Sequence, residues 1–271
     1  MIRDPATACA AARGPRSRRA VAILSAIALS AATVLACGDV SGGSSSVLSI
    51  QFDSLGAPGV VLGDSLRDTS GVVIHPVVHA YNFSGDEIVP SPAWFQSPDS
   101  GISVDSATGI LVGDSLRTAA RIIATVGGLQ AIQRVDVTLR PDSIVPIDSV
   151  DSLSYSQIDS TKNFSPTLTV KLTHGLAPND SAVRSYIVSF SIVSQSDPNL
   201  AVLVNEGRKL SVVDTTDANG LAGRALHINP ALIRSVSGVD SIVVNASARY
   251  RGALVRGSPV RLVLKVKQAG T

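Results

Sequence analysis

Residues 121–139 read RIIATVGGLQAIQRVDVTL. Two runs rich in aliphatic and β-branched residues, Arg121–Val126 and Arg134–Leu139, lie on either side of Gly127-Gly128. β-Branched residues favour strands, and a Gly-Gly pair is a common turn between the strands of a hairpin. Apolar and polar residues alternate through Val135–Leu139, as in a strand with one buried face. The stretch therefore predicts an antiparallel β-hairpin.

The composition of the chain extends this prediction to an all-β fold. Glu occurs only as Glu87 and Glu206, Met occurs once and Lys is sparse, so good helix formers are scarce. Val, Ile, Thr, Ser, Asp and Gly dominate the region after the N-terminal segment, as in strands joined by tight turns. Short apolar runs separated by turn signals predict two tandem β-sandwiches.

The expected strands form two series. The first comprises residues 47–52, 72–81, 93–96, 102–104, 109–112, 120–126 and 133–139. The second comprises residues 167–172, 186–194, 200–204, 209–213, 223–228, 241–250 and 260–266. The segment 141–159 is rich in Asp, Ser and Pro, and it is predicted to be a linker between a sandwich at 47–140 and a sandwich at 160–268.

The N-terminal segment has the pattern of a secretory signal. Residues 13–19 carry four arginines, residues 20–34 carry no charge, and Leu35 and Ala36 follow before Cys37. A basic region, an apolar region and a small residue at the cleavage site, here Ala36 directly before Cys37, define such a signal. A plain membrane anchor, or cleavage at an ordinary signal-peptidase site, is the alternative, although the run is at the short edge of the ~17–25 residues that span a bilayer.

The sequence Val34-Leu35-Ala36-Cys37 resembles the lipobox of bacterial lipoproteins. The resemblance implies that residues 1–36 are removed, that the Cys37 thiol carries a diacylglyceryl group and that the new amino terminus is acylated. Two or more acyl chains hold a protein stably at a membrane. Residues 37–46 would then form a Gly/Ser tether. By resemblance to enterobacterial sorting, Gly38 after the cysteine implies an outer-membrane location in the cell envelope.

Both predicted sandwiches resemble immunoglobulin-like families. Ala93–Asp99, Ile102–Gly113 and Arg121–Gly128 are similar to the W-x-S-x-D, V-D-x-x-T-G and T-I-T-A-T-x-G-G segments of one family, although Ser97 and Asp99 each lie one position later than in the first segment. Residues 47–140 therefore resemble a bacterial immunoglobulin-like domain of group 2. The usual Gly-Thr before the last strand is replaced by Thr118-Ala119-Ala120. Thr216–Ala222 (TDANGLA) gives residues 160–268 a looser resemblance to the group 1 repeats of intimin and invasin. A Gly-Asn-Pro-Val segment typical of that family is missing.

Two copies of a Gly-Asp-Ser-Leu motif, at 63–66 and 113–116, spell the signature of GDSL esterases. In that family a histidine three residues after an aspartate activates the serine, because the nucleophile needs a general base. The residues three positions before His75, His79, His174 and His227 are Val72, Pro76, Lys171 and Arg224. We therefore expect turns rather than nucleophiles, no enzymatic activity and no cofactor.

Metal sites have weak support in the sequence. Asp148 and Asp151 are candidates for an interdomain calcium site, since carboxylates suit that ion. The loop Asp214–Gly220 lacks the downstream glutamate of an EF-hand, with Leu226 at that position. His75 and His79 would share one face of a strand, but no cysteine or third histidine accompanies them.

Trp94, the single tryptophan, is expected in the core of its sandwich, with an exposed glycan-stacking role as the alternative. The remaining charge argues against nucleic acid, because residues 37–271 carry 18 basic and 20 acidic residues. The only cysteines are Cys9 and Cys37, so no disulfide is expected after cleavage.

These expectations together predict a non-enzymatic, lipid-anchored envelope protein that acts as a cell-surface interaction or adhesion module. The acyl chains on Cys37 would bind the membrane, and distal loops or a strand edge would bind another surface or envelope protein or a glycan. The alternative is a periplasm-facing structural spacer or accessory subunit of an envelope complex.

Overall fold

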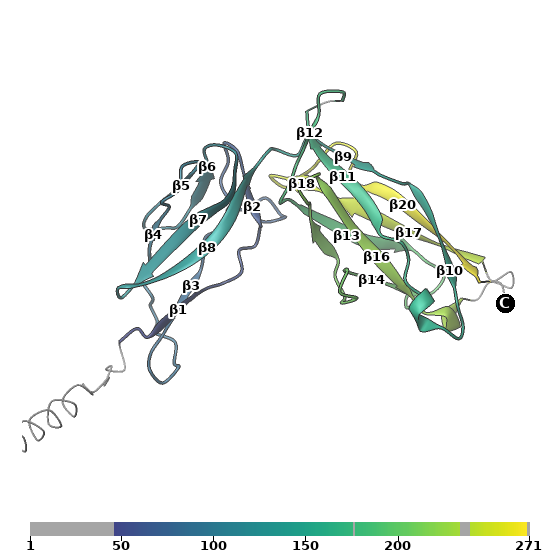
Figure 1. Cartoon of the computed structure of the whole chain (residues 1–271), viewed down its shortest axis with the longest axis horizontal. Coiled ribbons are helices and arrows are strands. Elements are labelled where there is room, and N and C mark those ends of the chain that lie inside the picture. Colours follow the sequence, from purple (N-terminus) through teal and green to yellow (C-terminus); the bar gives the residue numbers. More distant parts are fainter. Residues whose placement is uncertain (1–45, 176, 234–238, 270–271) are drawn as a thin grey trace, which may run out of the picture. The chain divides into compact units, whose positions relative to one another are not determined.

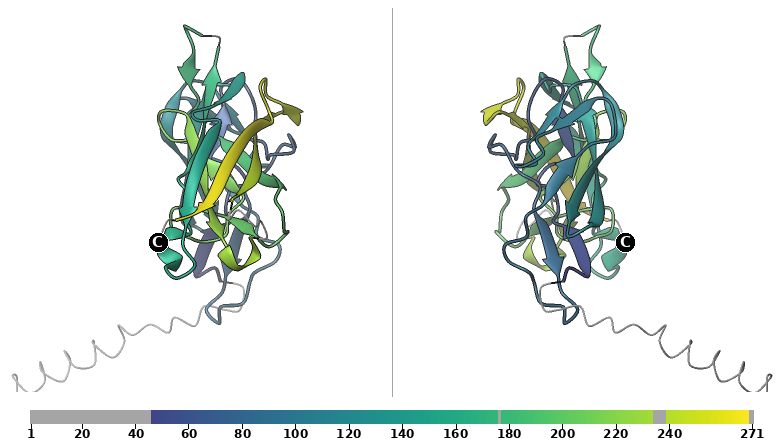
Figure 2. Two further views of the ribbon diagram at one scale, coloured as in Figure 1. Left: turned by 90° about the vertical axis from the view of Figure 1, so that its right-hand side faces the viewer. Right: turned by 90° about the vertical axis from the view of Figure 1, so that its left-hand side faces the viewer.

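The computed structural model describes residues 46–175, 177–233 and 239–269, and nearly all of its regular structure is β (Figure 1). Further views show strands and connecting loops, with helical structure in the described ranges limited to short turns (Figure 2). Within these ranges, no helix is long and apolar enough to cross a bilayer. The predicted signal segment 1–36 and Cys37 lie outside the described residues.

The first sandwich contains strands β1 to β8. Their bounds are Ser49–Phe52 (β1), Gly59–Val61 (β2), Val78–Tyr81 (β3), Trp94–Gln96 (β4), Ile102–Val104 (β5), Leu111–Gly113 (β6), Arg117–Val126 (β7) and Leu129–Thr138 (β8). One sheet has the order β2-β8-β7-β4, while β1 pairs with β3 and β5 pairs with β6. Buried residues from all of these groups form one core, which includes Val60, Ala80, Ile102, Leu111 and Ile122.

The predicted hairpin is confirmed as β7 and β8, which pair antiparallel from Ala120↔Val135 to Val126↔Leu129. Gly127 and Gly128 have φ angles of 56° and 86°, which residues with a Cβ rarely adopt. The alternation is also as predicted, since Val135 and Val137 are buried and Asp136 points away from the core. A two-residue turn with two positive φ angles matches the twist of the flanking strands.

The second sandwich contains the remaining elements. Their bounds are Ser143–Pro146 (β9), Val150–Tyr155 (β10), Ser160–Lys162 (η1), Leu168–His174 (β11), Ser181–Ala182 (β12), Ile187–Ser194 (β13), Ala201–Val204 (β14), Val213–Thr215 (β15), Leu221–Ile228 (β16), Pro230–Leu232 (η2), Val239–Ser247 (β17), Arg249–Tyr250 (β18), Ala253–Leu254 (β19) and Val260–Gln268 (β20).

Its strand order is that of an immunoglobulin constant-type sandwich. One sheet runs β9-β11-β16-β14, which corresponds to strands A, B, E and D, and β20-β17-β13 corresponds to strands G, F and C. Two additional strands, β10 and β15, extend the second sheet at its two edges. The predicted all-β fold with two sandwiches is confirmed.

The segment 141–159 is not the linker that its composition suggests. β9 pairs with β11, and β10 pairs in parallel with β20, so the chain passes from one sheet of the second sandwich to the other. Ile144, Leu153 and Tyr155 are buried in the core of that sandwich. Only residues 139–142 connect β8 to β9. Asp, Ser and Pro occur here because an edge strand that changes sheets needs a bend and few ladder hydrogen bonds.

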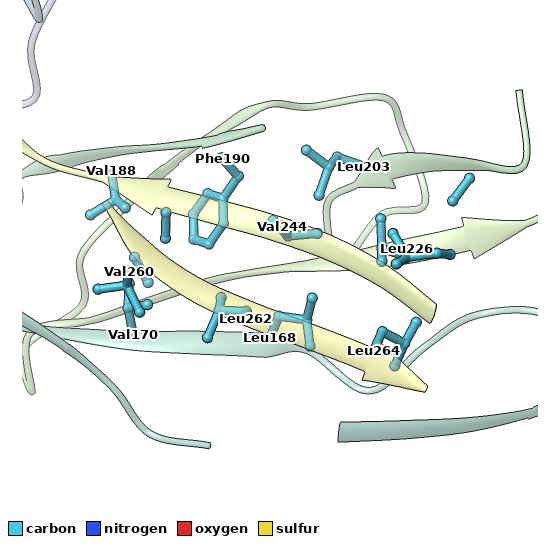
Figure 3. Close-up of a cluster of buried hydrophobic side chains, with 14 of the residues drawn as sticks. Leu168, Val170, Val188, Phe190, Leu203, Leu226, Val244, Val260, Leu262 and Leu264 are labelled. Atoms are coloured by element: carbon cyan, nitrogen blue, oxygen red, sulfur yellow. The ribbon is translucent and has the colours of Figure 1, made fainter. Parts of the chain in front are cut away.

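The core of the second sandwich is built from facing aliphatic side chains of both sheets. Figure 3 shows Leu168 and Val170 on β11, Phe190 on β13 and Leu262 on β20 pointing into the same space. Along β20 the inward-facing residues are all apolar and buried, and the residues between them are exposed or half-buried. The buried residues are Val260, Leu262, Leu264 and Val266. The packed layer explains why the second half of the chain folds without a disulfide.

Replacing Leu262 with Ala removes a fully buried side chain and should lower the free energy of unfolding by about 2–5 kcal/mol. The matched control is Leu254→Ala, since Leu254 is 46% exposed on β19. Denaturant unfolding of the two variants measures the difference. Equal losses at the two positions would contradict the core described above.

Candidate functional site

The outer face of the sheet β4-β7-β8 carries the most exposed aromatic side chain of a described strand. Trp94 on β4 is 58% exposed, and it lies opposite Thr125 on β7, which in turn lies opposite Gln130 on β8. Directly opposite residues in neighbouring antiparallel strands point to the same face. These three side chains therefore form one row across the sheet.

Two further rows continue this face along the strands. Gln96, Ile123 and Ile132 form the second row, and Arg121 and Arg134 form the third. We call this surface the Trp94 face, and it consists of Trp94, Gln96, Arg121, Ile123, Thr125, Gln130, Ile132 and Arg134. Ile132 is 58% exposed, and the other seven residues are exposed or half-buried.

The expectation that Trp94 is a core residue is wrong. Phe95 takes the inward position of β4, is 6% exposed and lies opposite the buried Ala124. Its ring packs so closely on Gly109 that a Cβ there would lie 3.1 Å from Phe95 Cε2. Since successive side chains of a strand point to opposite faces, burial of Phe95 turns Trp94 outward.

The polar side chains of the Trp94 face are available to a ligand. In the described ranges, the amides of Gln96 and Gln130 and the hydroxyl of Thr125 make no hydrogen bond to the protein. The three side chains lie on paired strands, so their Cα positions are fixed by the ladder of β4, β7 and β8. The face thus combines an apolar ring with free donors and acceptors.

One end of the face is cationic. The buried carboxylate of Asp99 accepts hydrogen bonds from Arg121 Nε at 3.0 Å, from the Arg121 backbone N–H at 2.8 Å and from Arg117 Nη2 at 3.0 Å. These bonds, above all those from Arg121, hold the pKa of Asp99 well below its usual range. Arg134, by contrast, forms no ion pair within the described residues. Two arginines share one carboxylate, and a third is unpaired.

The first Gly-Asp-Ser-Leu motif is a buried structural ion-pair cluster. Asp64 is 4% exposed and accepts hydrogen bonds from Arg67 Nη2 at 3.1 Å and from Arg251 Nε at 2.8 Å. Burial raises the pKa of Asp64, but the bonds from Arg251, Arg67 and the Ser65 N–H outweigh it and hold the pKa well below the usual range. The carboxylate therefore stays charged and fixes two guanidinium groups.

Neither motif places its serine beside a base. In the described chain no histidine is hydrogen-bonded to Ser65 or Ser115. Ser65 pairs with Val112 through its backbone as an isolated antiparallel β-bridge, and the Ser115 N–H donates a hydrogen bond to the Gly101 carbonyl at 3.1 Å. The first motif forms a turn after β2, in which the Asp64 carboxylate accepts a hydrogen bond from the Ser65 N–H at 2.8 Å, and the second motif lies at the end of β6.

The four histidines have separate partners. His75 Nδ1 contacts the Thr108 carbonyl at 3.1 Å, and His174 Nδ1 contacts Asp142 at 2.7 Å. The His227 ring stacks on Phe164, with centroids 4.4 Å apart. His79 lies between Glu87 (2.6 Å) and Asp53 (3.2 Å). His75 precedes β3, so it does not share a strand with His79 as expected.

The calcium candidates lie within the second sandwich. Asp148 is in the connection between β9 and β10, and Asp151 is on β10, where its carboxylate accepts a hydrogen bond from the Ser152 N–H at 2.7 Å. The loop at Asp217 is a turn, in which the carboxylate accepts from the N–H groups of Asn219 and Leu221. In the part of the chain that the structure describes, no group of three or more His, Cys, Asp or Glu could hold a metal ion.

Comparison with known proteins gives structural neighbours only. No protein-family profile matches the chain, and no curated protein matches it. A crystal structure of the S-layer protein SbsC, domains 4 and 5, is similar over 82% of this chain and 99% of that one, at 12% identity and a TM-score of 0.31. Human protocadherin-24 EC1-2 is similar over 83% of this chain and 100% of that one, at 14% identity and a TM-score of 0.26.

The sequence alone pointed to Trp94 but not to its surroundings. Gln96, Gln130 and Arg134 carried no motif, and they come together only through the register of three strands. The register of the predicted hairpin could have placed Gln130 and Arg134 opposite Thr125 and Arg121, because a Gly-Gly turn fixes which residues of β7 and β8 lie opposite each other.

Glu87 should raise the pKa of His79. The hydrogen bond that the His79 ring donates to Glu87, followed by the one that it donates to Asp53, favours the charged ring and raises the pKa of His79 above 6.5. The Glu87→Gln variant should therefore lower this pKa, as measured by an NMR titration of the ring protons. The stabilisation by charged His79 is fully present below the unfolded-state pKa and is lost as the pH rises through the folded-state pKa.

The variant Glu206→Gln is the control, because Glu206 is the only other glutamate and lies in a loop of the second sandwich. Glu87→Gln should destabilise the protein at about pH 5.5 more than at about pH 9, whereas Glu206→Gln should not. An unchanged His79 titration in Glu87→Gln would contradict this assignment.

Proposed function

We propose that this chain is a non-enzymatic, lipid-anchored envelope protein whose immunoglobulin-like sandwiches act as a cell-surface interaction or adhesion module. The observation that carries the proposal is the Trp94 face, on which Trp94 is 58% exposed beside the amides of Gln96 and Gln130, which make no hydrogen bond within the described residues. An exposed aromatic side chain on a rigid element is a common anchor for recognition.

The polar chemistry elsewhere supports a binding rather than a catalytic role. Asp64 and Asp99 are occupied by arginines, and no histidine of the described chain is hydrogen-bonded to either motif serine. Nucleophilic catalysis needs a serine with a base in hydrogen-bond reach. Recognition needs only a surface whose side chains are held in place, which the paired strands provide.

The anchor in this proposal is Cys37. The lipobox resemblance at Val34–Cys37 and the basic and apolar residues before it support cleavage and acylation. The group 2 and group 1 immunoglobulin-like resemblances of the two halves support an exported, modular protein, and the residue after Cys37 supports the outer membrane. Fold alone does not determine function, so the proposal rests on the face and the anchor.

A periplasm-facing spacer or accessory subunit is the second candidate. The short connection at residues 139–142 favours it, together with the hydrogen bond from Thr138 Oγ1 to the Arg184 carbonyl at 2.7 Å. A spacer needs modules that do not reorient freely. The two candidates differ in which side of the envelope the sandwiches face.

Acylation is tested by labelling cells with radioactive palmitate. The wild-type chain and the Cys9→Ala control should carry label and sediment with membranes, whereas Cys37→Ala should lose both label and sedimentation. Cys9 is the matched control because it is the only other cysteine. Label on Cys37→Ala would contradict the anchor.

Orientation is tested by treating intact and lysed cells with a protease. Loss of the wild-type protein from intact cells is expected for a surface module. Protection until lysis would contradict surface exposure and support the periplasm-facing candidate.

A further inference from the structure

We propose that the Trp94 face binds an acidic polysaccharide, with one sugar ring stacked on Trp94 and a carboxylate of a sugar further along the same polysaccharide chain held by Arg134. This inference deepens the proposed function, on which it rests, because it names the class of ligand for the interaction surface.

The indole of Trp94 is suited to a pyranose ring. One face of such a sugar is lined by C–H groups, which pack on an aromatic ring, while its hydroxyls point outward to polar partners. The large exposed fraction of Trp94 leaves the ring open to solvent on β4, the edge strand of its sheet. Because Trp has few rotatable bonds, ordering it on a ligand costs little conformational entropy.

The amides beside the ring supply the polar partners. Gln96 lies on the same strand face as Trp94, about 7 Å away, and Gln130 lies two strands away, about 10 Å from it. Each amide has donors and an acceptor, and a vicinal hydroxyl pair can bond to both. Thr125 lies between Trp94 and Gln130 and adds a hydroxyl.

The charge of the face selects an acidic ligand. Arg121 and Arg134 form the row about 14 Å from the row of Trp94, within the length of a short oligosaccharide. The nearby charges comprise Arg117, Arg121, Arg134, Asp99 and Asp136, which leaves one positive charge in excess. Asp136 is itself occupied, since it accepts from the Ala119 N–H at 2.6 Å. A guanidinium binds a carboxylate through two parallel hydrogen bonds.

Other occupants fit this surface less well. A stable protein interface buries about 800 Å² on each partner, usually with 20–30 residues around an apolar centre. The Trp94 face has eight residues, and only Trp94, Ile123 and Ile132 among them are large and apolar. A polysaccharide needs only a narrow strip with a ring, amides and a cation, which is what three rows of side chains provide.

The test uses the protein purified from membranes in detergent micelles, with the single tryptophan as reporter. Titration with oligogalacturonate, a chain of uronic acids, should change the Trp94 fluorescence saturably. Neutral maltohexaose should bind at least tenfold more weakly. No saturable change with oligogalacturonate, or equal affinity for both sugars, would overturn the proposal.

Variants separate the face from nonspecific charge binding. Arg134→Gln should weaken oligogalacturonate binding about tenfold, whereas Arg261→Gln, at an exposed arginine on β20, should not. Trp94→Ala should abolish the heat of binding in calorimetry while circular dichroism stays unchanged. Equal weakening by the two arginine variants, or full binding by Trp94→Ala, would also overturn the proposal.

This test does not depend on the location of the protein. Failure of sugar binding with palmitate label on Cys37 and loss to protease from intact cells would refute the ligand and leave the proposed function in place. Failure of acylation with intact sugar binding would refute the anchor and leave the ligand in place.

Discussion

Successive side chains of a β-strand point to opposite faces, and the first sandwich depends on this constraint at β4. Phe95 points into the core and lies opposite Ala124, so Trp94 and Gln96 point outward. A slip of one residue would bury Trp94 and expose Phe95. Phe95 also packs closely on Gly109, where a Cβ would lie 3.1 Å from Phe95 Cε2. The binding surface is thus a consequence of how the core is filled.

Aspartates hold the loops of this chain together. Asp105 accepts from the Thr108 N–H at 2.7 Å, and Asp159 caps η1 by accepting from the Thr161 N–H at 3.0 Å. Asp142 accepts from the Gly175 N–H at 2.9 Å and so fixes the start of the second sandwich. Short polar side chains that bond to nearby backbone groups favour turns. These three aspartates therefore stabilise loops through hydrogen bonds that they accept from backbone N–H groups.

Much of the fold could be predicted from the sequence. The hairpin at 121–139 and the strands around 241–247 and 260–266 were predictable, since their alternation and turn residues are local signals. β9 and β10 were missed because Asp, Ser and Pro residues lie within and beside them and are typical of loops. Their identity as strands comes from pairing with β11 and β20, which is a long-range contact.

The candidate site was predictable only in part, for the same reason. Trp94 could be identified from the sequence because it is the single tryptophan. The direction of its side chain, however, depends on whether residue 94 or residue 95 faces the core. Both are aromatic and follow Ala93, so local hydrophobicity does not distinguish them. Pairing of Phe95 with Ala124 decides the matter.

The binding surface requires that the Trp94 side chain is exposed to solvent, and the fluorescence of this single tryptophan measures that exposure. Emission and acrylamide quenching would be compared between the native protein and the protein unfolded in denaturant. An exposed indole predicts a native emission close to that of the unfolded chain, with strong quenching in both states. A blue-shifted native emission that acrylamide does not quench would mean that the Trp94 side chain is buried. That result would contradict both the register of β4 and the binding surface on the Trp94 face.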